Sequence, residues 1–160
     1  MKSWREALKS AVVPGIVGGA VASVTAARRA RKESGSAVAA INATSHVVWG
    51  DDAAKVEQAT LKHTGPGYLI NSAAAFFWAV VFEKLFGAAV DRRGAPAALL
   101  GAAATVGLAY ITDYKIVPRR LTPGYEKRVS GRSLLMIYSV IAGAFAAGAL
   151  LTRTASRSTS

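Results

Sequence analysis

The sequence predicts an all-α integral membrane protein, a bundle of four transmembrane helices with one short re-entrant or interfacial helix. Two observations lead to this prediction. Of the 160 residues 52% are hydrophobic, and the 18% that are charged gather between long uncharged runs. A helix needs roughly 20 mostly apolar residues to cross the hydrocarbon core of a bilayer. Four uncharged stretches reach or approach that length, namely residues 10–27, 64–82, 94–112 and 133–152.

The first predicted span covers residues about 8–27 and follows a short amphipathic start that places Trp4 near the membrane interface. Pro14 and Gly15 are expected to bend this span. The basic start and the apolar middle also fit a cleavable signal peptide. Arg28 and its basic neighbours follow the apolar run directly, and positive charge at that place resists translocation. We therefore favour a retained span.

Residues 37–50 are apolar but too few to cross a membrane. At 1.5 Å per residue, a helix of this length reaches roughly 21 Å, whereas the hydrocarbon core is about 30 Å thick. We expect a re-entrant or interfacial helix over residues 37–49, with a full span as the alternative. Asp51 or Asp52 is a suitable N-cap for a further short helix over residues 52–62.

The remaining spans are predicted over residues about 67–90, 95–114 and 132–152. The turn "DRRGAP" separates the second span from the third, and it places Pro96 in the first turn of the third. A basic, proline-containing loop leads into the fourth span. Residues 153–160 are expected to form a disordered tail, so that residues 1–152 make up a single domain.

The net charge of +11 comes from Lys and Arg residues that cluster beside the apolar runs. Cations in this position contact anionic lipid headgroups and set the orientation of the chain, so a lipid surface is the expected partner rather than nucleic acid. With four spans, the first and third connecting loops carry most of these cations. The positive-inside rule therefore predicts that both loops face the cytoplasm and both termini face outside.

Rows of small residues recur at every fourth position in the predicted spans. Lipid tails are as apolar as Leu, so transmembrane helices associate through small residues that let their backbones approach closely. A tight bundle is therefore expected. The rows are Ala11, Gly15, Gly19, Ser23 and Ala27 in the first span, Asn71, Ala75, Ala79, Glu83 and Gly87 in the second, Ala97, Gly101, Thr105, Ala109 and Asp113 in the third, and Ser139, Gly143 and Ala147 in the fourth.

The row in the second span contains Glu83, an ionisable side chain inside an apolar stretch. A carboxylate within a membrane costs a few kcal/mol or more unless it is paired, hydrated or protonated. Its candidate partners are Lys84, Asn42, His46, Tyr110 and Lys115. The sequence predicts an intramembrane polar cluster, with candidate members Asn42, His46, Asn71, Glu83 and Asp113. Such a cluster could bind a cation or relay protons. We favour the alternative, in which Glu83 lies within reach of the headgroups and the amides join neighbouring helices.

The basic loop "DYKIVPRRLTPGYEKRVS" is a second candidate site, in which two Pro residues fix turns. Its cations are Arg119, Arg120, Lys127 and Arg128. Each cation near anionic lipid contributes roughly 1 kcal/mol to membrane anchoring. The loop is therefore expected to anchor on lipid, and the alternative is a docking surface for a phosphate-bearing headgroup or an acidic partner.

No catalytic, cofactor-binding or metal-binding residue is predicted. Cys is absent, and the only histidines are His46 and His63, which do not share a span in which they could jointly ligate haem or a metal. The sequence contains no nucleophile elbow, phosphate-binding loop or zinc signature. We therefore expect no enzyme activity.

Together with the basic loop, the stretches "NATSHVVWGDD" and "FFWAVVFEKLFG" resemble a group of small uncharacterised multi-span proteins of the bacterial inner membrane. The resemblance implies that location and no activity. The predicted role is structural or accessory, in a bundle that packs as a homo-oligomer or against a larger membrane complex. One alternative is a small oligomeric transporter or ion- or proton-coupled channel that uses Glu83 and His46. A weaker alternative is a lipid-headgroup enzyme that uses His46 and acidic residues at the cytoplasmic face.

Overall fold

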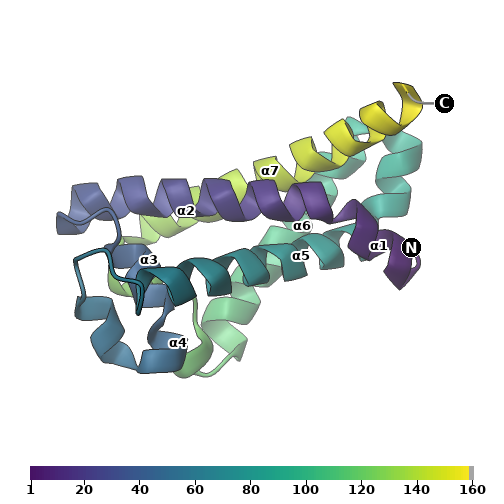
Figure 1. Ribbon diagram of the computed structural model, residues 1–160. Coiled ribbons are helices and arrows are strands. Elements are labelled where there is room, and N and C mark those ends of the chain that lie inside the picture. The colour runs from purple at the N-terminus through teal and green to yellow at the C-terminus, as the bar shows by residue number, and fades with distance from the viewer. Residues whose placement is uncertain (159–160) are drawn as a thin grey trace.

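The computed structural model describes the backbone of residues 1–158 and the side chains of residues 1–154. The regular structure of these residues is entirely helical, as the fold class predicts (Figure 1). The long helices are α2 (Val12–Ser34), α5 (Thr64–Arg93), α6 (Ala95–Ile111) and α7 (Gly131–Ser158). The short α-helices are α1 (Trp4–Ser10), α3 (Ala39–Thr44) and α4 (His46–Trp49).

Three helices are long and apolar enough to cross a membrane. They are α5, α6 together with the π-helical turn η2 (Thr112–Ile116), and α7. A fourth is present if α1 and α2, which meet at a 48° bend, form one broken span. The bend falls at Ala11, where the N-capped α1 ends, and not at Pro14 as predicted. Pro14 instead lies in the first turn of α2, where its missing N–H leaves no helical hydrogen bond unmade.

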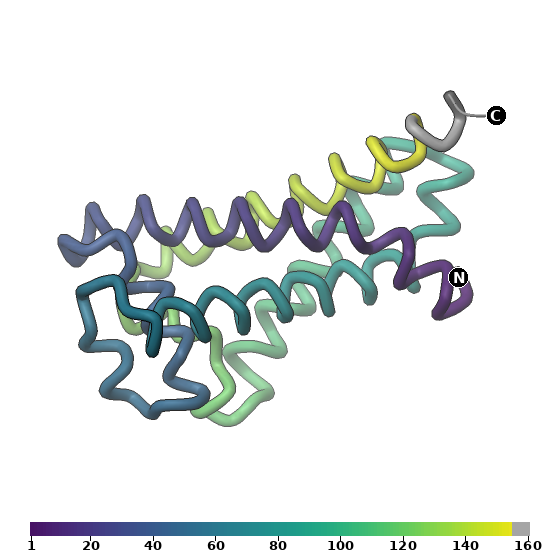
Figure 2. Tube along the Cα trace, in the orientation of Figure 1, coloured from purple at the N-terminus to yellow at the C-terminus, as the bar shows by residue number. Residues whose placement is uncertain are grey.

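The long helices alternate in direction, so that the N-terminus and the end of α7 lie at one end of the bundle (Figure 2). We call this the terminal end. Residues 35–63 and 112–130 connect the helices at the opposite end, which we call the cap end. Helix α2 packs against α5 and α7, and α6 packs against the same two helices, which closes a four-helix bundle.

Three of the four predicted small-residue rows face the inside of the bundle. A Cβ atom added at Gly148 would lie 2.8 Å from the Pro14 Cα, which shows how closely α2 and α7 approach. The prediction is wrong for the row of Ser139, Gly143 and Ala147, which is exposed. The inner face of α7 instead carries larger side chains such as Ile137 and Phe145, which are fully buried and fill the core.

The cap end differs from prediction in its second half. Within the predicted helix over residues 37–49, residues 39–49 form α3 and α4, two short helices that meet at Ser45, and neither is long enough to span. The predicted helix over residues 52–62 is wrong beyond Lys55, where the short 3-10 helix η1 (Asp51–Lys55) ends. The Asn42 side chain donates hydrogen bonds to the carbonyls of Val56 and Gln58 at 2.9 Å each, which holds this segment in a non-helical course.

The C-terminal segment also departs from prediction. Helix α7 continues to Ser158, so the disordered tail expected from residue 153 is wrong for the described residues. The reason is Arg153, which hydrogen-bonds the carbonyl of Ala149 on its own helix and the carbonyl of Gly87 on α5. The last two residues of the predicted tail, 159–160, lie outside the described part of the chain.

Candidate functional site

Glu83 belongs to a network of four charged side chains at the terminal end. Glu83 is fully buried, and its carboxylate accepts hydrogen bonds from Lys2 Nζ at 2.9 Å and from two nitrogens of Arg153 at 3.1 Å. Asp91, about two turns further along α5, accepts from Arg153 Nε at 2.7 Å and lies 3.7 Å from Lys2 Nζ. Two cations thus balance two carboxylates. We call this group the terminal clamp.

The terminal clamp joins both ends of the chain to α5. Lys84 adds a second contact, because its Nζ donates to the Lys2 carbonyl at 2.6 Å and lies 4.8 Å from the centre of the Trp4 ring. Gly87 leaves room for the clamp, since a Cβ there would overlap a Glu83 carboxylate oxygen. Both Glu83 oxygens are paired with cations, so the burial of this carboxylate is compensated within the chain.

His46 fixes the cap end. The ring is fully buried, and Nε2 lies 2.9 Å from the Thr122 carbonyl oxygen. A carbonyl can only accept, so Nε2 carries the proton. Nδ1 lies 3.6 Å from the carboxylate of Asp51, which accepts a hydrogen bond from Lys127 at 2.9 Å. That hydrogen bond is the main reason why the pKa of Asp51 is lowered. His46 therefore connects α4 to residues 112–130.

Asn42 and Asn71 both connect separate segments through their side-chain amides. Asn42 also accepts a hydrogen bond from Thr64 at 2.7 Å, at the start of α5. Asn71 donates to the Gly19 carbonyl on α2 at 3.2 Å and accepts from the Tyr125 hydroxyl at 2.5 Å. Burial raises the pKa of Tyr125, so its hydroxyl stays protonated and able to donate. Both amides therefore join neighbouring segments.

Most cations of the basic loop bind to other segments of the same chain. Arg120 donates to the backbone carbonyls of Val47 and Val48 on α4 at 2.9 and 3.1 Å. Arg128 pairs with Glu57 at 2.7 Å, and Lys127 pairs with Asp51. Among the described side chains, Arg119 is the member of the predicted docking group that makes no such contact. Three of the four cations therefore hold the two connections of the cap end together.

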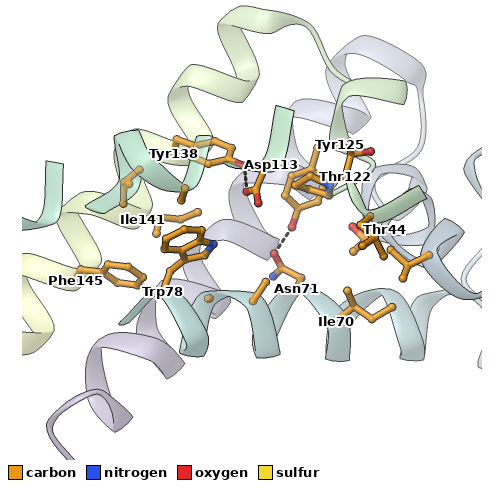
Figure 3. A pocket seen from close by; sticks show the side chains of 17 residues that line it. Thr44, Ile70, Asn71, Trp78, Asp113, Thr122, Tyr125, Tyr138, Ile141 and Phe145 are labelled. Carbon is orange, nitrogen blue, oxygen red and sulfur yellow. Dashed lines mark hydrogen bonds between the residues drawn. The ribbon is translucent and has the colours of Figure 1, made fainter. Parts of the chain in front are cut away.

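A cavity of about 110 Å³ lies where the cap end meets the bundle (Figure 3). Most of its lining is apolar, from α5, α6, α7 and residues 121–125. Its polar lining groups include Asn71, Asp113, Thr122, Tyr125 and Tyr138. The Tyr138 hydroxyl donates to the Asp113 carboxylate at 2.5 Å. Sequence reasoning missed both tyrosines. For Tyr138 the signal available was its helical spacing from the apolar positions Leu134 and Phe145 on α7, whereas Tyr125 lies in a loop turn without such a spacing.

The five residues of the predicted polar cluster do not meet at one place. Asn71 and Asp113 line the same cavity, and Asn42 and His46 lie in the cap end. Glu83 lies twelve residues beyond Asn71 on α5, or about 18 Å at 1.5 Å per residue. None of the partners predicted for its carboxylate pairs with it.

The true partners of Glu83, Lys2 and Arg153, were missed. Lys2 lies just before the first span and Arg153 just after the last. In a bundle of alternating helices both positions fall at the same end as the C-terminal part of α5, where Glu83 lies, and sequence reasoning could have used this.

Among the described residues, no three His, Asp or Glu side chains are arranged to hold a metal ion. Comparisons with models of protein families, with curated proteins and with solved structures find no match for the chain. Location in a bacterial inner membrane, which the sequence resemblance implies, therefore stays a prediction.

Proposed function

We propose that the chain is a small multi-span protein of the bacterial inner membrane with a structural or accessory role. In this proposal it packs through the outward face of α7 against a larger membrane complex or a second copy of itself. The observation that supports the proposal is the exposed row of Ser139, Gly143 and Ala147. Small residues are what transmembrane helices use to approach one another closely.

The surroundings of this row favour an approaching helix. A Cβ added at Gly143 would meet nothing within 4 Å, so the backbone of α7 is accessible there. A hollow of about 580 Å³ lies between α6 and α7, and its lining includes Gly107 and Ser139. A second hollow of about 460 Å³ lies between α2 and α7, and its lining includes Gly143 and Ala147. The row therefore forms a ridge of small residues between two grooves.

The polar residues give less support to the alternative of ion-coupled transport. An ion pathway that uses Glu83 and His46 would need both side chains within reach of one route. They lie towards opposite ends of the bundle, and each is occupied by partners from the chain itself. Contacts of this kind are expected of groups that hold a bundle together.

The first test is native mass spectrometry of the protein extracted gently from its own membrane. A stoichiometric second protein would support the accessory role, and a homo-oligomer would support self-association. Gly143→Ile should then weaken that association at least about tenfold, because the new side chain separates the helices. Ala73→Ile on the exposed face of α5 is the matched control and should leave the association unchanged. A strictly monomeric protein, without partner, would overturn the proposal.

A further inference from the structure

Asp113 is a carboxylate that lines the cavity without a cation to balance it. It accepts a hydrogen bond from Tyr138, but no Lys or Arg nitrogen among the described side chains lies within 4 Å of it. The acidic residues of the terminal clamp and of the cap-end ion pairs all have such partners. A buried or half-buried carboxylate is costly unless a positive charge or hydrogen bonds compensate it. The negative charge of Asp113 is therefore available to pair with a cation from outside the chain.

Glu126 adds to the negative charge beside the cavity. Its Oε1 accepts a hydrogen bond from Thr122 at 2.7 Å, and its Oε2 is buried without a hydrogen-bond partner. Thr122 and Tyr125, which lie four residues and one residue before Glu126 in the sequence, both line the cavity, although Glu126 itself does not. The described residues thus hold two carboxylates near the cavity, and neither has an ion-pair partner of its own.

The backbone around Asp113 is unusual in a way that fits a binding site. Helix α6 ends in the π-helical turn Thr112–Ile116, and such turns occur frequently at functional sites. Figure 3 shows the Asp113 carboxylate between Tyr138 and Tyr125, above Trp78 and Asn71. Asp113 therefore lies within the π-helical turn, and its carboxylate is directed at the cavity.

The lining of the cavity indicates which kind of cation fits. Inorganic cations such as Ca²⁺ prefer six to eight oxygen ligands, whereas most of this surface is aromatic or aliphatic. Organic ammonium groups are recognised by aromatic rings together with a carboxylate. Trp78, Tyr125 and Tyr138 provide the rings. The volume of about 110 Å³ is several times the roughly 10–15 Å³ that one water molecule requires, so a group of several heavy atoms has room.

We propose that this cavity binds an organic ammonium group, with Asp113 as its counter-ion and Trp78, Tyr125 and Tyr138 around it. Ala74 and Leu121 are exposed lining residues, and they mark where the cavity meets the surface of the molecule. The ammonium group comes either from a free amine or from the headgroup of an aminophospholipid. The cavity borders the hollow between α6 and α7, with which it shares Val106 and Tyr138, but the row of Ser139, Gly143 and Ala147 does not line it.

Trp78 provides a direct reporter of binding. The other two tryptophans, Trp4 and Trp49, are 62% and 47% exposed, so both are replaced by Phe to leave Trp78 alone. The purified protein, in a detergent without amine groups, is titrated with choline chloride while Trp78 fluorescence is recorded. We expect a saturable change that sodium chloride at equal concentration does not produce. The absence of a saturable change with choline would overturn the proposal.

A neutral ligand of the same shape separates charge recognition from simple filling of an apolar cavity. In 3,3-dimethylbutan-1-ol a carbon atom replaces the ammonium nitrogen of choline. We expect it to bind at least about tenfold more weakly than choline, because it gains nothing from Asp113. Equal binding of the two ligands would overturn the proposal, and this comparison requires no change to the site itself.

The Asp113→Asn variant tests the counter-ion. The amide oxygen can still accept the hydrogen bond from Tyr138, so we expect the fold to be retained, which circular dichroism checks. Choline binding should fall at least about tenfold. The matched control is Asp52→Asn, because the Asp52 side chain is 89% exposed at the same end of the molecule. Undiminished binding by a folded Asp113→Asn variant would contradict the role of Asp113. If that variant does not fold, the neutral ligand decides.

Competition identifies the source of the ammonium group. Lysophosphatidylethanolamine and free ethanolamine are each added to the protein with choline bound. If the lipid displaces choline at the lower concentration, the cavity holds a lipid headgroup. If ethanolamine does so, the ligand is a free amine. Failure of both to displace choline would overturn both proposed sources, the free amine and the aminophospholipid headgroup.

Discussion

The terminal clamp shows how single residues compensate a buried charge in this bundle. Moving a carboxylate into a low-dielectric interior costs several kcal/mol, and well-placed cations with hydrogen bonds offset that cost. Glu83 is fully buried, whereas its partners Lys2 and Arg153 keep 13% and 15% of their side chains exposed. By contrast, the pair of Asp52 and Lys55 is 89% and 79% exposed, and pairs of that kind contribute about 0–1 kcal/mol.

Glu83→Gln is therefore expected to lower the free energy of unfolding by about 3 kcal/mol, because Lys2 and Arg153 then share Asp91 alone. The measurement is denaturant unfolding in mild detergent, followed by circular dichroism. Asp52→Asn is the control and should change the free energy by less than about 0.5 kcal/mol. A Glu83→Gln protein as stable as the parent would mean that the terminal clamp does not stabilise the bundle.

At the scale of elements, the contact between α3 and α5 positions the cap end. The first turn of α5 passes so close to α3 that a Cβ at Gly67 would overlap the Ile41 carbonyl oxygen. Gly65 lies in the same turn, and a Cβ there would meet nothing within 4 Å. Replacing each glycine by Ala therefore distinguishes two effects. Both substitutions raise the helix propensity, but only the one at Gly67 disturbs close packing.

Gly67→Ala is expected to destabilise the protein by about 1–3 kcal/mol, because the backbone of α3 must move away from α5. Gly65→Ala should stabilise it by about 0.5–1 kcal/mol, since Ala is the better helix former. Unfolding of both variants in detergent measures the difference. Hydrogen exchange of residues 39–49 should increase in Gly67→Ala only. Equal effects of the two substitutions would exclude close packing as the determinant.

The sequence allowed the long elements to be predicted better than their connections. The lengths of the uncharged runs locate α5, α6 and the start of α7 to within a few residues, since helix length there follows from apolar composition. The course of residues 56–63 could not be predicted, because Asn42 captures its backbone carbonyls. For the candidate site, the spacing on one helix face predicted the burial of Asn71 and Glu83.

The partners of these two residues come from distant parts of the chain. Lys2 and Tyr125 are 81 and 54 residues away from Glu83 and Asn71, respectively, and only tertiary packing brings them together. A helical period describes one face of one helix and contains no information about which other helix lies against it. The membership of the terminal clamp and of the cavity therefore required the structure.

At the scale of the whole molecule, the alternating helices place both cation-rich connections at the cap end. If the bundle lies in a membrane, the positive-inside rule predicts that the cap end faces the cytoplasm. The absence of Cys makes single-Cys labelling a clean test of this orientation.

A Cys introduced at Ser36, at the cap end, is expected to react with an impermeant maleimide only after the cells are permeabilised. A Cys in place of Arg92, an exposed residue at the terminal end, should react in intact cells. Each variant serves as the control for the other, because both are made in the same background without Cys. Labelling in the reverse pattern would invert the orientation, and labelling of both in intact cells would contradict a membrane-spanning bundle.

The members of the terminal clamp are synthesised far apart in time. Lys2 is translated 81 residues before Glu83, whereas Arg153 follows Glu83 by 70 residues. A growing chain that already contains α5 and α6 therefore holds two carboxylates, Glu83 and Asp91, opposite a single lysine. Charge balance is completed only when α7 has packed against α5. We expect chains that stop before Arg153 to be less stable than the full sequence, because the buried Glu83 then lacks one of its two cations.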